Sequence, residues 1–276
     1  MLKITALSFV LLSTAFLASA QQTAADTKAV ATPFVLGETV EIQSSALAEK
    51  RVLNIYLPEG YQQETDVSYP VIYLLDGSAN EDFIHIVGLV QFFRMQFNMP
   101  KTIVVGIANV DRKRDFTFPT TDAEQKKAYP TTGGSARFID FLEQEVQPFI
   151  QKKYRVTGAK TIIGQSLGAL LATEILLKKP ELFDRYCIVS PSLWWDNESL
   201  LKQAPTLLGK ERRNPGHVYV SVGTEGKVME RDAKDLAKLL LKSGIKVDFV
   251  PLPKEDHGSI LHNSVYAAFQ LFYPVK

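Results

Sequence analysis

A single serine stands between two glycines in the stretch Gly164-Gln165-Ser166-Leu167-Gly168, which fits the pattern G-x-S-x-G. In hydrolases this pattern forms a sharp turn between a strand and a helix, and the turn presents the serine hydroxyl as a nucleophile. At ordinary frequencies of about 7% for glycine and serine, a chain of this length holds roughly 0.1 such matches by chance. The pentapeptide therefore indicates nucleophilic chemistry at Ser166, and a serine that merely caps a helix is the alternative.

A neutral serine hydroxyl is a weak nucleophile and needs a base within hydrogen-bond reach. Among the four histidines, His257 lies in the loop after the last expected strand, at the edge of the sheet where ligands bind in such folds. The other three fall inside expected helices or at the start of a strand, which favours structural roles for His85, His217 and His262. His257 is the predicted base, and a solvent-exposed loop histidine is the alternative.

The acid that orients the base should follow the serine and precede the histidine along the chain. Glu225 comes directly after the expected strand 217–222 and has the right placement. Glu230 and Asp232 begin the next helix, where acids are favoured by the helix dipole in any case. We therefore expect Glu225 to be the acid, with Glu230 as the alternative. The sequence also leaves open that no acid takes part in catalysis.

A tetrahedral intermediate needs amide donors for its oxyanion. The predicted donors are the N–H of Leu167, after the nucleophile, and the N–H of Ser78, in the loop after the strand-like YLLD; an ordinary Asp-Gly turn is the alternative there. Asp256, His257 and His262 lack the spacing of a metal-binding motif. We expect no catalytic metal and no cofactor.

The elements that must position these residues follow from apolar periodicity. Period-two alternation predicts an antiparallel pair of strands at 38–44 and 51–57. Continuous apolar runs, typical of strands covered on both faces, alternate with helical patterns through the rest of the chain. They predict strands at 70–76, 102–108, 160–164, 186–190, 217–222 and 246–251, and helices at 81–97, 135–152, 166–178, 230–242 and 259–272.

This order predicts an α/β fold in which helices cover both faces of a mainly parallel sheet that carries an antiparallel N-terminal strand pair. The roughly 25 residues after Asn109 form one long loop, and loops of that length inside a compact domain are usually functional or disordered. The expected organisation is a signal peptide at 1–20, a flexible leader at 21–36 and one domain at 37–276.

The first twenty residues carry Lys3, then an apolar stretch, then Ala18-Ser19-Ala20, which is typical of a secretory signal cleaved before Gln21. A membrane anchor is the alternative, but the apolar run is short for a bilayer. We therefore expect a periplasmic or secreted protein with no stable membrane association. The only cysteine is Cys187, in an apolar strand-like run, so no internal disulfide is expected.

Charge argues against a polyanionic partner. Without residues 1–20, which contain one lysine and no acid, 30 basic residues balance 30 acidic residues. A chain of zero net charge has no general electrostatic attraction for nucleic acid or anionic lipid. The expected partner is a small-molecule ester, and the sequence leaves the oligomeric state open.

Four long stretches resemble, in chain order, segments of the Putative esterase family of the α/β-hydrolase superfamily, the group around enterochelin esterases and esterase D: VIYLLDGSANEDF, VDRKRDFTFPTT, GGSARFIDFLEQEVQPFIQKKYRV and SPSLWWDNESL. The resemblance implies an α/β-hydrolase fold with Ser166 as nucleophile, His257 as base and an acid near Glu225. It also implies that a Ser-His dyad is an alternative to a triad. The chain departs from the common GHSxGG elbow at Gln165 and Ala169, of which the glutamine also resembles enterochelin esterases.

These observations predict an exported serine esterase that cleaves carboxylic esters through an acyl-enzyme, and the resemblance favours a siderophore trilactone as substrate. A carbohydrate acetyl or feruloyl esterase and an acyltransferase on the same scaffold are the alternatives, and a non-catalytic exported binding protein is less favoured. Trp194 and Trp195 are candidate walls of the substrate pocket, with core packing as the alternative. Arg112 and Arg114, on the long loop, are candidate contacts for an anionic or catecholate substrate, with exposure to solvent as the alternative.

Overall fold

The computed structural model describes residues 30–209 and 215–275. The predicted signal peptide, 1–20, and residues 21–29 of the predicted leader lie outside the described residues, so the model does not bear on them. Within the described part of the chain, no helix combines the length and the apolar character needed to cross a bilayer.

The chain divides into two units by its internal contacts. Leu36–Lys276 form one compact unit, and Met1–Val35 form the other. Of the second unit, only residues 30–35 are described, and they contain no helix or strand. All the described elements therefore belong to the unit that begins at Leu36.

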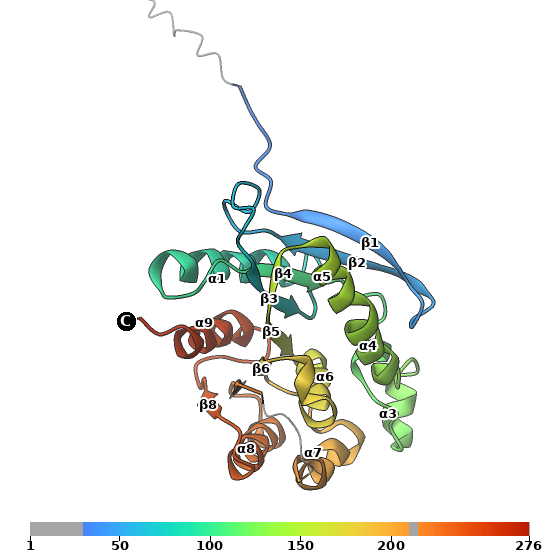
Figure 1. The fold of residues 1–276 in the computed structure, drawn as a ribbon. Helices are drawn as coiled ribbons and strands as arrows, with labels where there is room; N and C mark the ends of the chain where they lie inside the picture. Colours follow the sequence, from blue (N-terminus) through green and yellow to red (C-terminus); the bar gives the residue numbers. More distant parts are fainter. Residues whose placement is uncertain (1–29, 210–214, 276) are drawn as a thin grey trace, which may run out of the picture. The chain divides into compact units, whose positions relative to one another are not determined.

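Eight strands form one sheet in the order β1-β2-β4-β3-β5-β6-β7-β8. β1 pairs antiparallel with β2 and β2 pairs antiparallel with β4, whereas all other neighbours are parallel. Figure 1 shows the β1–β2 pair at one edge of the sheet, and the predicted fold class is confirmed. The strands are β1 (Glu38–Ser44), β2 (Glu49–Tyr56), β3 (Tyr69–Leu74), β4 (Ile103–Ile107), β5 (Val156–Gln165), β6 (Arg185–Val189), β7 (His217–Val222) and β8 (Val247–Pro251).

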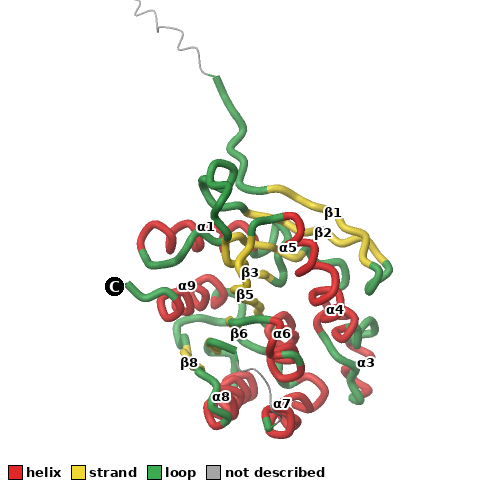
Figure 2. Tube along the Cα trace, in the orientation of Figure 1, coloured by secondary structure: helices red, strands yellow, loops and turns green. Residues whose placement is uncertain are grey.

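Helices cover both faces of the sheet, as Figure 2 shows. One core cluster joins α1 and α9 to the sheet through side chains such as Phe93 and Phe269, and the other joins the remaining large helices through residues such as Leu170 and Leu236. The helices are α1 (Phe83–Gln96), α2 (Arg112–Phe116), α3 (Ala123–Ala128), α4 (Ser135–Phe141), α5 (Gln147–Lys153), α6 (Leu167–Lys178), α7 (Trp195–Leu208), α8 (Lys227–Lys242) and α9 (Ile260–Phe272), with the π-turn η1 (Leu142–Val146) and the 3₁₀ turn η2 (Pro180–Leu182).

The burial of the strands follows their sequence patterns. β4 and β7 are buried at every position, as expected for continuous apolar runs between two helical layers. β1 is mostly exposed and alternates along its length, as expected for an edge strand with one packed face. The central strands therefore give a rigid frame whose carboxyl ends hold the residues that could do chemistry.

Two segments differ from the prediction. The loop predicted after Asn109 contains two short helices, α2 and α3, whose first turns are capped by Asp111 and Asp122. An unpredicted helix, α7, follows β6, and three consecutive residues at its start, 196–198, have positive φ. Asp-Asn at its start and Pro205 inside it are features of turns and helix ends, which explains why periodicity did not reveal this helix.

Candidate active site

Ser166 occupies the turn between the end of β5 and the start of α6, with φ 58° and ψ −119°. This backbone conformation is costly for a residue other than glycine, and such costs are concentrated at functional sites. The Ser166 amide donates to the Val189 carbonyl at 3.0 Å, which ties the turn to β6. A Cβ at Gly164 would lie 2.6 Å from the backbone of Gly168, so only glycine allows the strand and helix to approach this closely.

His257 lies in the loop between β8 and α9 and reaches the serine. Its Nε2 is 3.0 Å from Ser166 Oγ, and its Nδ1 contacts Glu225 Oε2 at short hydrogen-bond distance. With Nδ1–H donating to the carboxylate, Nε2 is left to accept from the serine hydroxyl, the arrangement that a general base requires. The side chain of Gln165 donates to the His257 carbonyl, so the residue before the serine also holds the histidine loop.

Glu225 follows β7 and is almost fully enclosed, with its side chain 3% exposed, whereas that of His257 is 48% exposed. Its Oε1 accepts from the Ser190 hydroxyl and, at 2.9 Å, from the Gly223 amide. Burial by itself raises the pKa of Glu225, but hydrogen bonds from His257, Ser190 and Gly223 outweigh it and hold the pKa below its usual value. The carboxylate is therefore ionised and fixed against the imidazole.

Glu230, the alternative acid, lies elsewhere. Its Oε1 accepts from the amides of Glu225, at 3.2 Å, and Gly226, at 3.1 Å, just before the first turn of α8. It therefore binds amides at the start of a helix, as the helix-dipole alternative expected. Asp256 likewise accepts from the amides of Gly258 and Ser259 next to the start of α9.

The two amides predicted to bind an oxyanion lie on segments that flank the serine. Leu167 is the first residue of α6, where an N–H has no carbonyl partner within the helix. Ser78 lies in the loop after β3, and the neighbouring Gly77 amide already donates to the Ile107 carbonyl at 3.0 Å. Their roles stay predictions that rest on these positions.

A cavity of about 730 Å³ opens beside the serine, histidine and glutamate. Tyr129 and Trp194 give it aromatic walls, and Met229 and Ser192 complete the lining near the serine. The Ser192 hydroxyl lies 3.3 Å from Ser166 Oγ. Tyr129, Met229 and Ser192 were not predicted, because they come from three separate elements and no local pattern marks them.

The sequence model of the family described as Putative esterase matches residues 44–248. Ferri-bacillibactin esterase BesA of Bacillus subtilis is 29% identical over 253 residues, covering 82% of this chain and 86% of BesA. An IroE-like serine hydrolase from Shewanella oneidensis has a similar structure, with TM-score 0.78, 30% identity, and coverage of 86% of this chain and 80% of the other. The BES protein from Bacillus cereus has TM-score 0.77, 27% identity, and coverage of 90% and 100%.

The chain belongs to the Putative esterase family. This membership and the similar proteins make the chain an enzyme of the ester-hydrolase class, so the resemblance stated from sequence motifs is confirmed. Among the described residues of this esterase, no group of three or more histidine, cysteine, aspartate or glutamate side chains is arranged to hold a metal ion.

The two tryptophans of the esterase have different places. Trp194 lines the cavity, in line with the prediction for it. Trp195 is 0% exposed, and its indole N–H donates to the Phe118 carbonyl at 2.8 Å. The prediction that Trp195 contacts substrate is therefore corrected, because its ring packs in the core and its one polar atom is already satisfied.

The two arginines also have different surroundings. Arg112 lines a second hollow, of about 390 Å³, that shares Ser166 and His257 with the main cavity. Arg114 instead pairs with Asp115 at 2.7 Å and Glu49 at 2.6 Å, in a cluster that contains the buried Arg51. The prediction that Arg114 binds substrate is corrected, because its guanidinium is occupied by two carboxylates and lines neither hollow.

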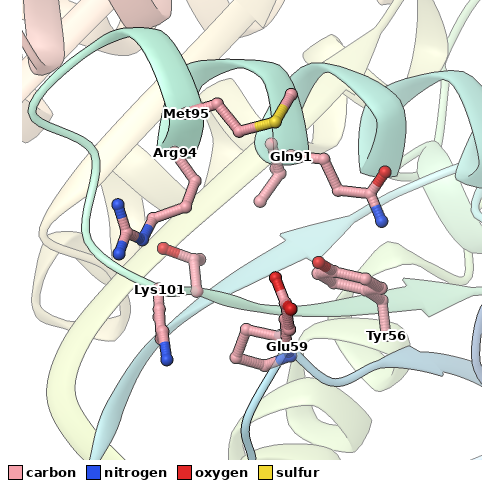
Figure 3. A pocket seen from close by; sticks show the side chains of 9 residues that line it. Tyr56, Glu59, Gln91, Arg94, Met95 and Lys101 are labelled. Carbon is pink, nitrogen blue, oxygen red and sulfur yellow. The ribbon is translucent and has the colours of Figure 1, made fainter.

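Figure 3 shows a further cavity, of about 410 Å³. Tyr56 at the end of β2 and Lys101 just before β4 form part of it, and the second half of α1 supplies Arg94 and Met95. Because Tyr56 pairs with Val104 at the start of β4, this cavity opens at the amino ends of the parallel strands. It shares no residue with the two hollows of the esterase at Ser166.

Proposed function

We propose that this esterase is an exported serine hydrolase that cleaves carboxylic esters of small molecules through an acyl-enzyme on Ser166. The observation that carries the proposal is the continuous chain of contacts from Ser166 Oγ to His257 Nε2, at 3.0 Å, and from His257 Nδ1 to Glu225. The three side chains come from the loops after β5, β8 and β7, at the carboxyl edge of the sheet where ligands bind in open α/β folds.

In the acylation step, Ser166 Oγ attacks the ester carbonyl carbon while His257 Nε2 takes the hydroxyl proton. The carbonyl oxygen becomes an oxyanion that accepts from the amides of Leu167 and Ser78. The C–O bond to the alcohol then breaks, and the imidazolium returns the proton to the departing alkoxide. Glu225 keeps the imidazole in the required tautomer and stabilises its positive charge.

In the deacylation step, water takes the place of the alcohol. His257 removes a proton from the water, the hydroxide attacks the acyl carbon, and the same amides hold the second oxyanion. The bond from the acyl carbon to Ser166 Oγ breaks, and the serine regains its proton from His257. An acyltransferase would use an acceptor alcohol instead of water at this step, so the acceptor alone separates the two reactions.

For the substrate we propose a siderophore ester, with a trilactone as the specific form. Support comes from the names of similar proteins, which include the ferri-bacillibactin esterase of Bacillus subtilis and a siderophore enterobactin esterase of Emericella nidulans that is 31% identical over 160 residues. The aromatic walls Tyr129 and Trp194 suit aromatic acyl groups, which bury well against such rings. Feruloyl esters share that property and are the alternative substrate class.

We further propose that residues 1–20 are an export signal and that 37–276 act as one catalytic domain. Export would bring the enzyme to a periplasmic or secreted siderophore. N-terminal sequencing of the protein recovered from outside the cytoplasm tests this part, and an N-terminus at Gln21 is the expected result.

The catalytic part is tested with the mature protein and its Ser166→Ala variant on p-nitrophenyl butyrate. Removing the nucleophile of a Ser-His-acid site lowers kcat by about 10⁴-fold or more, and we expect a loss of that order. A fluorophosphonate should add one adduct to the wild type, on the peptide that contains Ser166. Equal activity of the two proteins, or a label on another residue, would sink the assignment.

Substrate class is tested by comparing kcat/KM for a catecholate trilactone, a feruloyl sugar ester and an acetylated sugar. We expect the trilactone to have the highest value, with its linear hydrolysis product released. A higher value for either sugar ester would reassign the substrate, and a transfer product formed with added alcohol in preference to hydrolysis would identify an acyltransferase.

A further inference from the structure

We propose that Arg112 is a positioning residue: it joins the loop after β3 to the turn at Ser166 and so sets the spacing of the two amides that receive the oxyanion. The inference rests on the proposed function and adds a residue to it. The sequence alone suggests Arg112 as a contact to the substrate. Its partners in the structure point to a different role.

Arg112 binds the Asp76 carboxylate with two parallel hydrogen bonds, from Nε to Oδ1 at 2.6 Å and from Nη2 to Oδ2 at 2.9 Å. The same Nη2 donates to the Gln165 carbonyl at 3.2 Å. Gln165 immediately precedes Ser166, and Asp76 lies two residues before Ser78. One rigid guanidinium therefore spans the two backbone segments that carry the predicted oxyanion amides.

The loop that Arg112 binds contains a residue, Asp76, in an unfavourable backbone conformation. Asp76 adopts φ 55°, a left-handed conformation that residues other than glycine keep only where the surrounding structure holds it. Its carboxylate also accepts from Asn109 at 2.7 Å, so both oxygens are used. The guanidinium carbon also lies over the Phe116 ring, 5.5 Å from its centre, in a cation–π contact that helps to hold the arginine in place.

The loop after β3 packs closely against the turn at Ser166 and the first turn of α6. A Cβ at Gly168 would lie 3.2 Å from Asp76 Oδ2, so the carboxylate sits directly over the first turn of α6. Gly77 packs closely as well: a Cβ there would lie 2.3 Å from the Cα of Gly106, so only glycine fits at this position of the loop. Because Ser78 follows Asp76 by two residues on this closely packed loop, we expect that loss of the Arg112 contact shifts the Ser78 amide relative to Ser166.

Charge around Arg112 argues against a primary role in binding an anionic substrate. The hollow that it lines also contains Asp76, Glu81 and Asp82, three acids against one arginine. An anion entering this hollow would meet a surplus of negative charge. Three N–H bonds of the guanidinium are already directed at Asp76 and Gln165.

A positioning role predicts a particular kinetic pattern. Oxyanion donors bind the transition state and not the ground state, so their displacement lowers kcat and leaves KM nearly unchanged. Removing one such donor costs about 10²–10³ in kcat. Loosening the donors without removing them should cost less, so we expect Arg112→Ala to lower kcat roughly 10- to 100-fold on p-nitrophenyl butyrate, an uncharged ester.

The experiment compares Arg112→Ala, Arg112→Lys and Arg114→Ala with the wild type on this ester and on the p-nitrophenyl monoester of succinic acid, which is anionic. Each protein is first shown to unfold cooperatively, and a boronic acid that forms a tetrahedral adduct with the serine reports on the oxyanion site. Arg114→Ala is the matched control, because it removes ion pairs of the same loop that do not reach Gln165 or Asp76.

We expect kcat and boronate affinity to fall in parallel for Arg112→Ala on both esters, and millimolar guanidinium to restore part of the activity of this variant alone. Arg112→Lys should remain impaired, because an ammonium cannot make the two parallel bonds. Unchanged kcat for Arg112→Ala, or a rise in KM confined to the anionic ester, overturns the proposal and makes Arg112 neutral or a substrate contact. If the wild type itself neither hydrolyses the ester nor reacts with a fluorophosphonate, the proposed function fails instead.

Discussion

Within two residues of the carboxyl ends of three parallel strands, a residue other than glycine adopts a positive φ, whereas none of the residues that line the cavity at the opposite end does. The three are Asp76 after β3, Ser166 after β5 and Ser190 after β6. The opposite cavity, around Tyr56 and Lys101, has polar and apolar walls (Figure 3), and its lining residues are not among those with positive φ.

Each strained residue sends its side chain to another part of the site. Asp76 binds Arg112, Ser166 binds His257 and Ser190 binds the acid Glu225. A left-handed residue of this kind costs about 1–3 kcal/mol, which a fold tolerates where the conformation serves a function. At the carboxyl end, the fold therefore accepts unfavourable backbone conformations that place side chains for catalysis. The cavity at the opposite end has no such residues, and a cavity alone is weak evidence for a catalytic site.

Among the residues that support the nucleophile, the largest expected effect is a difference in kcat between variants of two glutamates at the carboxyl end. Glu225→Ala should lower kcat by about 10³–10⁴-fold, because the histidine then loses the group that fixes its tautomer and stabilises its charge. Glu230→Ala should change kcat less than about twofold and only weaken the start of α8, since its carboxylate binds amides there. Steady-state kinetics on p-nitrophenyl butyrate measures both.

The ranking of the two glutamates has clear alternatives. A loss below about fivefold for Glu225→Ala, with a cooperatively folded variant, would mean that Ser166 and His257 work as a dyad. A larger loss for Glu230→Ala than for Glu225→Ala would move the acid to the helix, and the contact between Glu225 and His257 would then have no catalytic meaning.

Periodicity and chain order could predict the frame and the order of the reacting groups. Continuous apolar runs marked the parallel strands because burial on both faces leaves no room for alternation, as at β4 and β7. The positions of Ser166 and His257 after strands followed from the same runs. Chain position favours Glu225, directly after a strand, over Glu230, whose place at the start of a helix the helix dipole explains, and the structure places Glu225 against the imidazole.

The partners of these groups could not be predicted, because they depend on contacts between distant segments. Ser190 lies 35 residues from the glutamate that it binds, and no local pattern marks it. Trp195 and Arg114 differ from their neighbours Trp194 and Arg112 only in the direction of the side chain. Residues of one type that lie one or two positions apart have different surroundings, so residue type and loop location leave their roles undecided.

The next effect concerns Ser190. Ser190→Ala keeps the backbone but removes a hydrogen bond to the ionised Glu225, and bonds of that kind contribute about 1.5–3 kcal/mol. We expect kcat to fall about tenfold as the acid becomes less well held. In a Glu225→Ala background the same substitution should change kcat little further, because Ser190 acts on the site through its hydrogen bond to Glu225.

The stability effect of Ser190→Ala should depend on pH. Because the pKa of Glu225 is held below its usual value in the folded protein, its carboxylate contributes stability above the unfolded-state pKa that is lost as pH falls through the folded-state value. Losing the Ser190 bond moves the folded pKa upward. The difference in free energy of unfolding between wild type and variant should therefore be full at neutral pH and shrink in acid. Urea denaturation from pH 7 to about pH 3.5 checks this, and a constant difference would contradict it.

The smallest expected effect isolates the strain at the nucleophile itself. Ser166→Ala and Ser166→Gly both abolish the reaction and both lose the contact to His257, so they differ only in what the backbone at φ 58° and ψ −119° costs. Glycine relieves about 1–3 kcal/mol of strain but adds roughly 0.5–1 kcal/mol of conformational entropy to the unfolded chain. The glycine variant should therefore be more stable than the alanine variant by about 1 kcal/mol, or about 2–4 °C in Tm.

Thermal unfolding of the two inactive variants, followed by circular dichroism, measures this difference directly. A matched pair at the opposite end, Met95→Ala and Met95→Gly in the last turn of α1, should show the reverse order, because glycine loses more conformational entropy than alanine in a helical backbone. If Ser166→Gly were instead the less stable of its pair, the turn would not be strained. We would then expect no unfavourable conformational free energy from the positive φ of Asp76 and Ser190 either. The side chains at the carboxyl end of the sheet would in that case be positioned without a loss of stability.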